Sequence, residues 1–325
     1  MHHLLIILAI FFSLNSPELS ASTSVGSIKT LSGEVKVSRG GELLPSNMGM
    51  PILKNDELIT GKNSAVGIIM HDNTVLTAGE DSSLSVESFT YDRKSRRGSL
   101  RTNLRKGSLS SISGHLAKTS PDSVRFKTAT MTLGVRGTEF IIEVNDNDEV
   151  DTSIILLEEP DGSVGKIDIE TPSGNVETVD TAFTQVDVDQ KGELKTSLLS
   201  SLDVFARFCG LFDAQPSRPK TYVFYFDDLG DLTKPSEEML EALTSDIRLR
   251  GYPDIEVVGY TDNSYDDKQA DDISSYLADN LYSLLKNDIS EESINIVARG
   301  AFDLLISKSN EYFEPLNNRV EVTLK

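Results

Sequence analysis

The segment that most constrains the fold is residues 134–144, which reads GVRGTEFIIEV. Two glycines bracket Arg136, and glycine tolerates positive φ angles and close backbone approach, so we predict a tight turn that leads into a strand. Beyond the turn, apolar residues alternate with acidic ones, which is typical of a half-buried strand. The apolar face carries Phe140, Ile142 and Val144, and the other face carries Glu139 and Glu143. An ion pair between Arg136 and Glu139 is expected to clamp the turn. A ligand site at Arg136 is the alternative to this structural interpretation.

The rest of residues 28–194 has the same character. Short apolar runs such as 65–70 (AVGIIM) and 124–127 (VRFK) are separated by turn-forming residues. Hairpin turns are indicated by Pro-Asp-Gly at 160–162 and Pro-Ser-Gly at 172–174. We therefore predict an all-β roll or sandwich over residues 28–194.

Two further segments carry a family resemblance. Residues 56–61 (DELITG) and 71–76 (HDNTVL), together with the 134–140 segment, resemble the G-D-x-L-x-T-G, D-G-T-x-L and V-R-G-T-x-F patterns of the FecR domain, a bacterial periplasmic module. Asn55 and Asn73 stand where the family has glycine. Asparagine tolerates the left-handed conformation better than most residues, so both turns are expected to form. The resemblance implies a signalling role, because FecR proteins transmit occupancy to sigma-factor control.

The remaining chain reads as a linker followed by an α+β domain. Residues 198–212 have the i, i+3, i+4 apolar spacing of an amphipathic helix, and residues 214–219 (AQPSRP) read as a linker, so we assign 195–219 to helix and linker. Strands and helices then alternate over residues 220–325 in the order βαβαββ. The predicted strands are 222–226, 255–260, 294–298 and 319–324, and the predicted helices begin at Thr233 and Asp267, the second ending at Leu285.

This order resembles an OmpA-like domain, the module by which envelope proteins hold peptidoglycan. The matching segments are GYTD at 259–262, Ile273-Ser274 with Ala278, and NNRVEV at 317–322. The resemblance implies a ligand site at Thr261, Asp262 and Arg319. The sequence departs from the family at other binding positions: Leu277 replaces an Arg, Ala270 an Asn, and Asn318 the first Arg of N-R-R. We therefore predict weak or absent peptidoglycan binding.

One basic stretch contrasts with the acidic chain. Its cations are Arg93, Lys94, Arg96, Arg97, Arg101, Arg105 and Lys106, with no acid between them, whereas the whole chain has a net charge of −20. We predict a hairpin with its tip at residues 95–98. It is either a solvated edge that blocks strand-to-strand aggregation or a binding patch for an envelope protein or an anionic envelope polymer.

Composition sets the remaining limits. Residues 1–21 contain a short apolar run followed by small residues, which is typical of a cleaved signal peptide, and no later stretch is long and apolar enough to span a membrane. We therefore expect a periplasmic protein, associated with the cell wall or the outer membrane. Residues 221–325 hold 22 acidic and 9 basic residues, so −13 of the net −20 lies there. This charge balance argues against nucleic acid as a partner.

No reaction chemistry is evident. After signal removal only His71 and His115 remain, without a nucleophile or a metal-ligand neighbour in sequence, and the aspartates around Asp262–Asp272 fit no calcium loop. We predict no cofactor, no metal and no enzymatic activity. The favoured interpretation is an envelope binding or scaffold protein. A FecR-type signalling module and a hydrolase of unrecognised type remain as alternatives.

Overall fold

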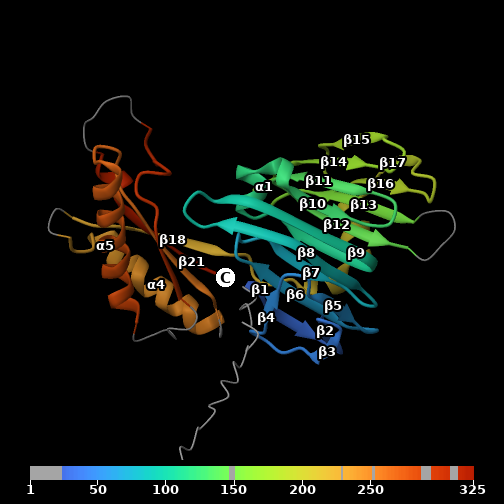
Figure 1. Cartoon of the computed structure of the whole chain (residues 1–325), viewed down its shortest axis with the longest axis horizontal. Coiled ribbons are helices and arrows are strands. Elements are labelled where there is room, and N and C mark those ends of the chain that lie inside the picture. The colour runs from blue at the N-terminus through green and yellow to red at the C-terminus, as the bar shows by residue number, and fades with distance from the viewer. Residues whose placement is uncertain (1–23, 146–150, 228–229, 251–252, 287–293, 308–313) are drawn as a thin grey trace, which may run out of the picture.

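The computed structural model describes residues 24–145, 151–227, 230–250, 253–286, 294–307 and 314–325. The predicted signal peptide at 1–21 lies outside them. Most of the described chain is β structure. A large β domain lies beside a smaller C-terminal domain that contains both helices and strands (Figure 1). No helix within these residues combines the length and the apolar character needed to cross a membrane.

The β domain is built from two sheets that share the long strand β9 (Arg97–Ile112). One half of β9 pairs with β7 and β12, and the other half pairs with β8 and β10. The first sheet has the order β4 (Pro51–Leu53), β1 (Ser24–Ser32), β6 (Ala65–Met70), β7 (Val75–Ala78), β9, β12 (Glu139–Val144), β13 (Thr152–Leu157), β16 (Thr184–Val188), β17 (Leu194–Leu198). The second has the order β3 (Glu42–Pro45), β2 (Val35–Arg39), β5 (Glu57–Thr60), β8 (Ser83–Asp92), β9, β10 (Val124–Lys127), β11 (Thr132–Arg136), β14 (Lys166–Glu170), β15 (Val176–Val179).

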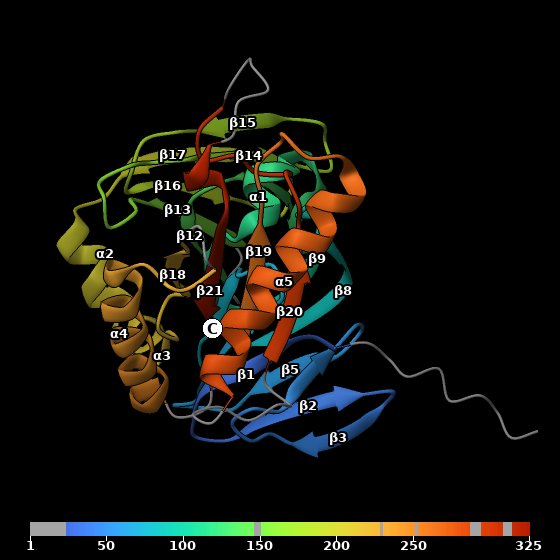
Figure 2. The same cartoon turned by 90° about the vertical axis from the view of Figure 1, so that its left-hand side faces the viewer.

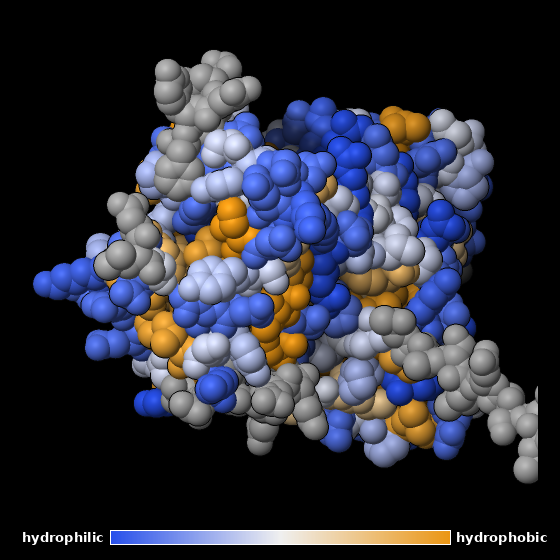
Figure 3. All heavy atoms as spheres, turned by 60° about the vertical axis from the view of Figure 1, so that its left-hand side comes forward, coloured by the Kyte–Doolittle hydropathy of each residue, from blue (hydrophilic) through white to orange (hydrophobic). Residues whose placement is uncertain are grey.

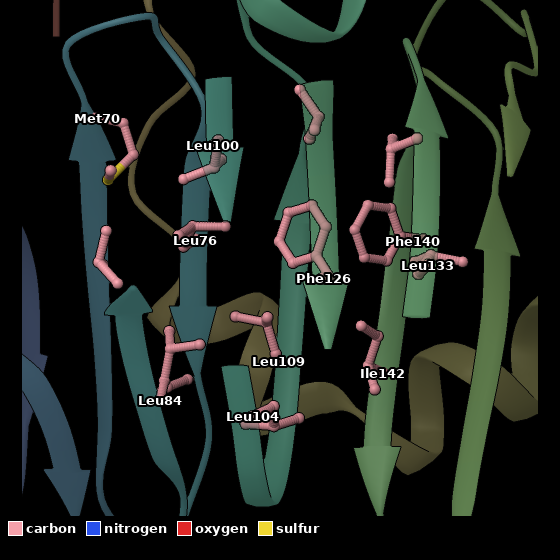
Figure 4. Packing of buried hydrophobic residues seen from close by; sticks show 14 of the residues in the cluster. Met70, Leu76, Leu84, Leu100, Leu104, Leu109, Phe126, Leu133, Phe140 and Ile142 are labelled. Carbon is pink, nitrogen blue, oxygen red and sulfur yellow. The ribbon is translucent and has the colours of Figure 1, made fainter. Parts of the chain in front are cut away.

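The core of this domain lies between the inward faces of the two sheets. Successive side chains of a strand point to opposite faces, so the apolar half of each alternating strand meets its counterpart from the other sheet. Figure 4 shows Phe126 and Phe140 facing each other in this core, and their ring centroids are 4.9 Å apart in an edge-to-face arrangement. Leu104 and Leu109, both from β9, lie in the same layer.

The predicted helix at 198–212 is wrong in its bounds. Leu198 belongs to β17, and the helical part is divided into α2 (Ser201–Arg207) and α3 (Cys209–Ala214). Phe208 leaves the helical region between them, with φ of −112° and ψ of 23°. Its apolar residues still pack as the spacing predicts: Val204, Phe208 and Leu211 cover Ile141, Ile155 and Leu157 on the outer face of the first sheet. Two other short helical elements are α1 (His115–Thr119) and η1 (Pro121–Ser123).

The C-terminal domain has the predicted order of helices and strands. Its elements are β18 (Lys220–Tyr225), α4 (Lys234–Arg250), β19 (Ile255–Tyr260), α5 (Asp267–Leu285), β20 (Ile294–Ala298), η3 (Pro315–Asn317) and β21 (Arg319–Leu324), with the sheet order β18-β21-β19-β20. Helices α4 and α5 cover one face of this sheet (Figure 2), and the strands lie between these helices and the β domain (Figure 1). The likeness of this domain to the OmpA-like family remains a prediction.

The two domains meet without a common apolar core. Each buried hydrophobic cluster among the described residues belongs either to residues 25–212 or to residues 222–324. Figure 3 shows hydrophilic residues along the visible part of the junction. Hydrogen bonds and ion pairs are the main side-chain contacts that join the two domains.

Candidate functional site

The basic stretch forms the tip and one strand of the β8–β9 hairpin, which projects toward the C-terminal domain (Figure 1). Residues 93–96 make the turn. Asp92 Oδ1 accepts a hydrogen bond from the backbone N of Ser95 (2.6 Å), and Arg96 has a left-handed backbone with φ of 55°. The turn is thus shaped locally by the Asp92 side chain and by an uncommon non-glycine conformation at Arg96.

The hairpin tip rests on the helix-free face of the C-terminal sheet. Alternation along β19 and β21 sends Val257, Val320 and Val322 to the core under the helices. The intervening residues point the other way, and apart from the buried Val258 they are polar. They include Glu256, Tyr260, Arg319 and Glu321, and Tyr260 pairs in register with Arg319.

Arg96 is the central contact of this docking surface. Its Nη2 donates to Tyr260 Oη (2.6 Å) and to Glu321 Oε2 (3.3 Å), and its Nη1 lies 3.5 Å from Asp303 Oδ2. Only 20% of its side chain is exposed. Tyr260 Oη in turn donates to Glu321 Oε2 (3.0 Å). Charge-assisted hydrogen bonds in a partly dry site are stronger than neutral ones, so Arg96 anchors the tip.

Two other tip cations also have acidic partners in the C-terminal domain. Arg93 Nε lies 3.2 Å from Glu256 Oε1, and Lys94 Nζ lies 2.6 Å from both oxygens of Asp271. Because these pairs connect residues more than 150 positions apart in sequence, they fix the orientation of one domain on the other.

The C-terminal domain also reaches toward the hairpin with Arg299. This side chain is 2% exposed; its Nε donates to the backbone O of Lys94 (2.6 Å), its Nη1 donates to Tyr260 Oη (3.2 Å), and it pairs with Asp303. The guanidinium groups of Arg96, Arg299 and Arg319 lie 6.0, 5.4 and 3.9 Å from the Tyr260 ring centroid. Burial is the main cause that raises the pKa of Tyr260 to about 12, so it stays a neutral donor and acceptor.

A second contact zone lies at the ends of β1 and β21. Asp254 accepts from Ser27 Oγ (2.7 Å) and pairs with Lys29 (2.9 Å). Lys325 Nζ donates to the backbone O of His71 (2.7 Å) and lies 3.3 Å from Glu256 Oε2. Burial lowers the pKa of Lys325, with Glu256 opposing that shift.

His71 lines an interdomain cavity of about 460 Å³ together with Arg93, Glu256 and Lys325. Burial lowers the pKa of its imidazole to about 4, and the positive charges of Arg93 and Lys325 act in the same direction. A neutral His71 is therefore part of the docked state near neutral pH.

The residues of the predicted peptidoglycan site are used internally. Asp262 is fully buried and accepts hydrogen bonds from Asn317 Nδ2 (3.0 Å) and the backbone N of Ser264 (2.9 Å), while Thr261 Oγ1 donates to Asn318 Oδ1 (2.9 Å). Arg319 does lie beside this turn, as the family order implies. Its guanidinium, however, donates to Glu321 (2.9 Å) and to the backbone O of Asp303 (3.0 Å) rather than to Asp262.

The family's remaining binding positions are apolar and buried here. Leu277 lies in the apolar core beneath α5, and Ala270 is 4% exposed. Leu277 therefore extends the core.

The motif residues of the β domain hold turns and strands in place. Asp56 is buried and accepts a bidentate pair from Arg39 (2.9 and 2.7 Å). Asp72 accepts from the hydroxyl and backbone N of Thr74 (2.7 and 3.1 Å). Asn55 and Asn73 have φ of 68° and 71°, which confirms that asparagine adopts the left-handed conformation at both positions.

The predicted pair between Arg136 and Glu139 is wrong. Arg136 Nη2 lies 3.5 Å from Asp122 and 3.4 Å from Asp168, whereas Glu139 pairs with Arg218 of the linker. The turn at Gly137 (φ 59°) explains this, because it separates Arg136 on β11 of the second sheet from Glu139 on β12 of the first sheet. Arg136 is thus engaged at the protein surface.

The other predicted patch residues do not reach the C-terminal domain. Arg97, Arg101 and Lys106 are exposed, and Arg105 pairs with Glu57 in its own domain. The basic stretch is therefore divided into docked tip cations (Arg93, Lys94 and Arg96) and strand cations that remain at the surface.

Several docking residues could not be recognised from the sequence. Tyr260, Arg299 and Lys325 look ordinary in the sequence, and the alternation of Glu321 with Val320 and Val322 is the one signal that could have indicated a second polar face. Within the described ranges, no three acidic, histidine or cysteine side chains gather as a metal site would require.

Comparison with known protein families identifies a domain in part of the chain. Residues 56–159 match the family model described as "FecR protein". The chain contains a FecR domain. No match was found among curated proteins.

Solved structures show only limited similarity. Two crystal structures of a "putative anti-sigma factor" from Parabacteroides distasonis share 15% identity with this chain, with TM-scores of 0.36 and 0.34; each alignment covers 74% of this chain and 96% or 97% of the other. A structure described as "Cell surface anchoring domain" aligns over 19% of this chain and 82% of its own length, with 31% identity and a TM-score of 0.19. At these TM-scores the backbones overlap too little to support a functional argument.

Proposed function

We propose that this protein is a non-enzymatic regulatory protein of the bacterial cell envelope, in which the C-terminal domain is an internal partner of the FecR domain. The observation that carries this proposal is the docking of the hairpin tip on the helix-free sheet face through Arg93, Lys94 and Arg96. A regulatory module needs two states of similar free energy. A polar interface without a shared apolar core can open at modest cost.

The FecR domain supports signalling over a passive scaffold, since the family resemblance implies transmission of occupancy. A scaffold that holds peptidoglycan through the C-terminal domain has less support, because Asp262 and Arg319 are occupied by internal hydrogen bonds. We also propose that residues 1–21 direct export and that the protein resides in the periplasm.

The test compares two chromosomal variants in the native host, Arg96→Glu and Arg97→Glu. The first places a carboxylate beside Glu321 and Asp303, and the second changes the charge equally at an exposed neighbour. We expect Arg96→Glu to alter transcription of a small gene set and Arg97→Glu to leave it unchanged. Unaltered transcription in both strains, together with detergent sensitivity in Arg96→Glu, would instead favour a scaffold.

A separate measurement addresses peptidoglycan. Purified protein should sediment little with peptidoglycan, and Asp262→Ala should not reduce that amount. Leu277→Arg is unsuitable as a gain-of-binding test because it would bury a guanidinium in the apolar core. Strong wild-type sedimentation that Asp262→Ala abolishes would overturn this part of the proposal.

A further inference from the structure

Arg101 lies on the outer face of the second sheet, in its interior rather than at its edge, because residues 100–103 of β9 have a strand on either side. Strand β9 is paired with β8 on one side and with β10 on the other. Charges that block edge-to-edge aggregation belong on unpaired strands. That explanation therefore does not account for Arg101.

Two arginines lie directly opposite each other on this face. In the parallel pairing of β9 and β10, Arg101 is in register with Arg125, and the next outward position on β10 is Lys127. Like charges opposite each other across a strand pair are destabilising. Among the described residues, Arg101, Arg125 and Lys127 have no carboxylate within ion-pair distance, in contrast to the tip cations.

The FecR signature itself makes room for one of these cations. A Cβ atom added at Gly134 would lie 2.7 Å from Arg125 Nη1, so the guanidinium lies over the bare backbone of β11. Gly134 also pairs in register with Arg125. The glycine before Val135-Arg136 thus lets Arg125 lie flat against the sheet, with Arg101 on the adjacent strand.

The surroundings indicate the chemistry of a partner. Hydroxyl and amide side chains occupy the neighbouring outward positions: Ser88 opposite Arg101, Ser99 and Asn103 on β9, and Thr132 opposite Lys127. None of the exposed large hydrophobic residues of the described chain lies on β8, β9, β10 or β11. Protein interfaces depend on apolar and aromatic anchors, whereas arginine forks with hydroxyl donors suit phosphate oxygens.

We propose that this cationic sheet face, formed by Arg101, Arg125 and Lys127, binds a phosphate-bearing polymer that lies across strands β9 and β10. A row of phosphates would neutralise the positive charges of Arg101 and Arg125, which are in register and which no ion pair among the described residues offsets. This site is separate from the docked tip and does not depend on the proposed regulatory function.

The experiment measures binding of long-chain inorganic polyphosphate to the full chain by isothermal titration calorimetry at two salt concentrations. The test variant is Arg101→Gln with Arg125→Gln. The control is Lys191→Gln with Lys195→Gln, which removes the same charge from exposed positions near the β16–β17 turn. We expect about tenfold weaker binding and a smaller salt dependence in the test variant, and about wild-type affinity in the control.

Folding of the test variant is checked by thermal unfolding, where we expect a melting temperature no lower than that of the wild type. Absence of wild-type binding, or equal weakening in both double variants, would overturn the proposal. Poly-L-glutamate is titrated in parallel. If it binds as tightly as polyphosphate and with the same dependence on Arg101 and Arg125, an acidic protein partner replaces the phosphate polymer.

Discussion

Arg96 and Arg97 are adjacent in sequence and identical in chemistry, yet they belong to different parts of the molecule. Arg96 lies in the domain junction and contacts Tyr260 and Glu321, whereas Arg97 is exposed at the start of β9. The same contrast separates the docked tip from the cationic sheet face. A run of like charges in a sequence is therefore not one surface, because strand alternation and a single left-handed residue divide it.

The two groups also differ in what balances their charge. Carboxylates of the acidic C-terminal domain neutralise the tip cations, so their pairing stabilises one arrangement of the domains. The sheet face holds Arg101 and Arg125 in register, and neither has an ion pair among the residues that the structure describes. In the first case opposite charges contribute to structure, and in the second like charges reduce stability and indicate binding.

The largest expected effect comes from reversing Arg96. A carboxylate beside Glu321 and Asp303 replaces two attractions by two repulsions, and like-charge contacts at an interface cost several kcal/mol. We expect the domains of Arg96→Glu to separate, seen as a larger radius of gyration in small-angle scattering and faster proteolysis near residues 214–219.

Arg97→Glu is the matched control and should keep the wild-type radius. Arg96→Gly removes the same contacts without adding repulsion and suits the left-handed backbone, so an intermediate result is expected. A compact Arg96→Glu would show that the tip does not hold the domains together.

Acidification should give the next largest effect. The pKa of His71 is lowered from 6.5 to about 4, so the folded protein binds fewer protons than the unfolded chain within that window. Stability therefore falls as the pH drops from about 6.5 to about 4, by up to about 3 kcal/mol for this group. Denaturant unfolding at pH 7 and pH 4.5 measures the loss.

His71→Gln should reduce that pH dependence, because glutamine does not titrate. His115 offers a comparison: burial lowers the pKa of its imidazole to about 3, and its Nε2 is hydrogen-bonded by Asn73 within the β domain. If His71→Gln leaves the pH dependence unchanged while His115→Gln abolishes it, the pH sensitivity belongs to the β domain and not to the junction.

Salt should have a smaller effect, confined to the tip. The Lys94–Asp271 pair is well exposed on both sides, and exposed pairs contribute roughly 0–1 kcal/mol that added salt screens. We expect hydrogen exchange in β19 and β21 to rise modestly between low and high salt. Lys94→Gln should remove part of this salt-dependent increase in exchange. An increase as large as in the wild type would show that the Lys94–Asp271 pair is not its source.

Sequence patterns predicted much of the fold because local rules agree with packing. The bounds of β20, β21 and α5 follow from apolar periodicity and from Asp266, whose side chain caps α5 by accepting from the backbone N of Gln269 (2.8 Å). The partners of Arg96, Arg136 and Glu139 could not be predicted, since each contact joins distant segments and depends on the sheet register. Likewise, nothing in the sequence indicates that the hairpin tip covers the sheet face that carries Glu256 and Glu321.

The smallest predicted effect tests the sheet face without any ligand. Arg101→Gln removes one member of the like-charge pair with Arg125 while keeping a long polar side chain that still covers the sheet. Relief of that repulsion should raise the free energy of unfolding by a few tenths of a kcal/mol, up to about 1. Urea unfolding measures this change, with Lys195→Gln as the control for net charge. A clear loss of stability would mean that Arg101 has a structural partner and that its charge is not kept for binding. A gain, combined with weaker polyphosphate binding, would show that the face gives up stability for its ligand, unlike the tip, where each cation contributes to both structure and docking.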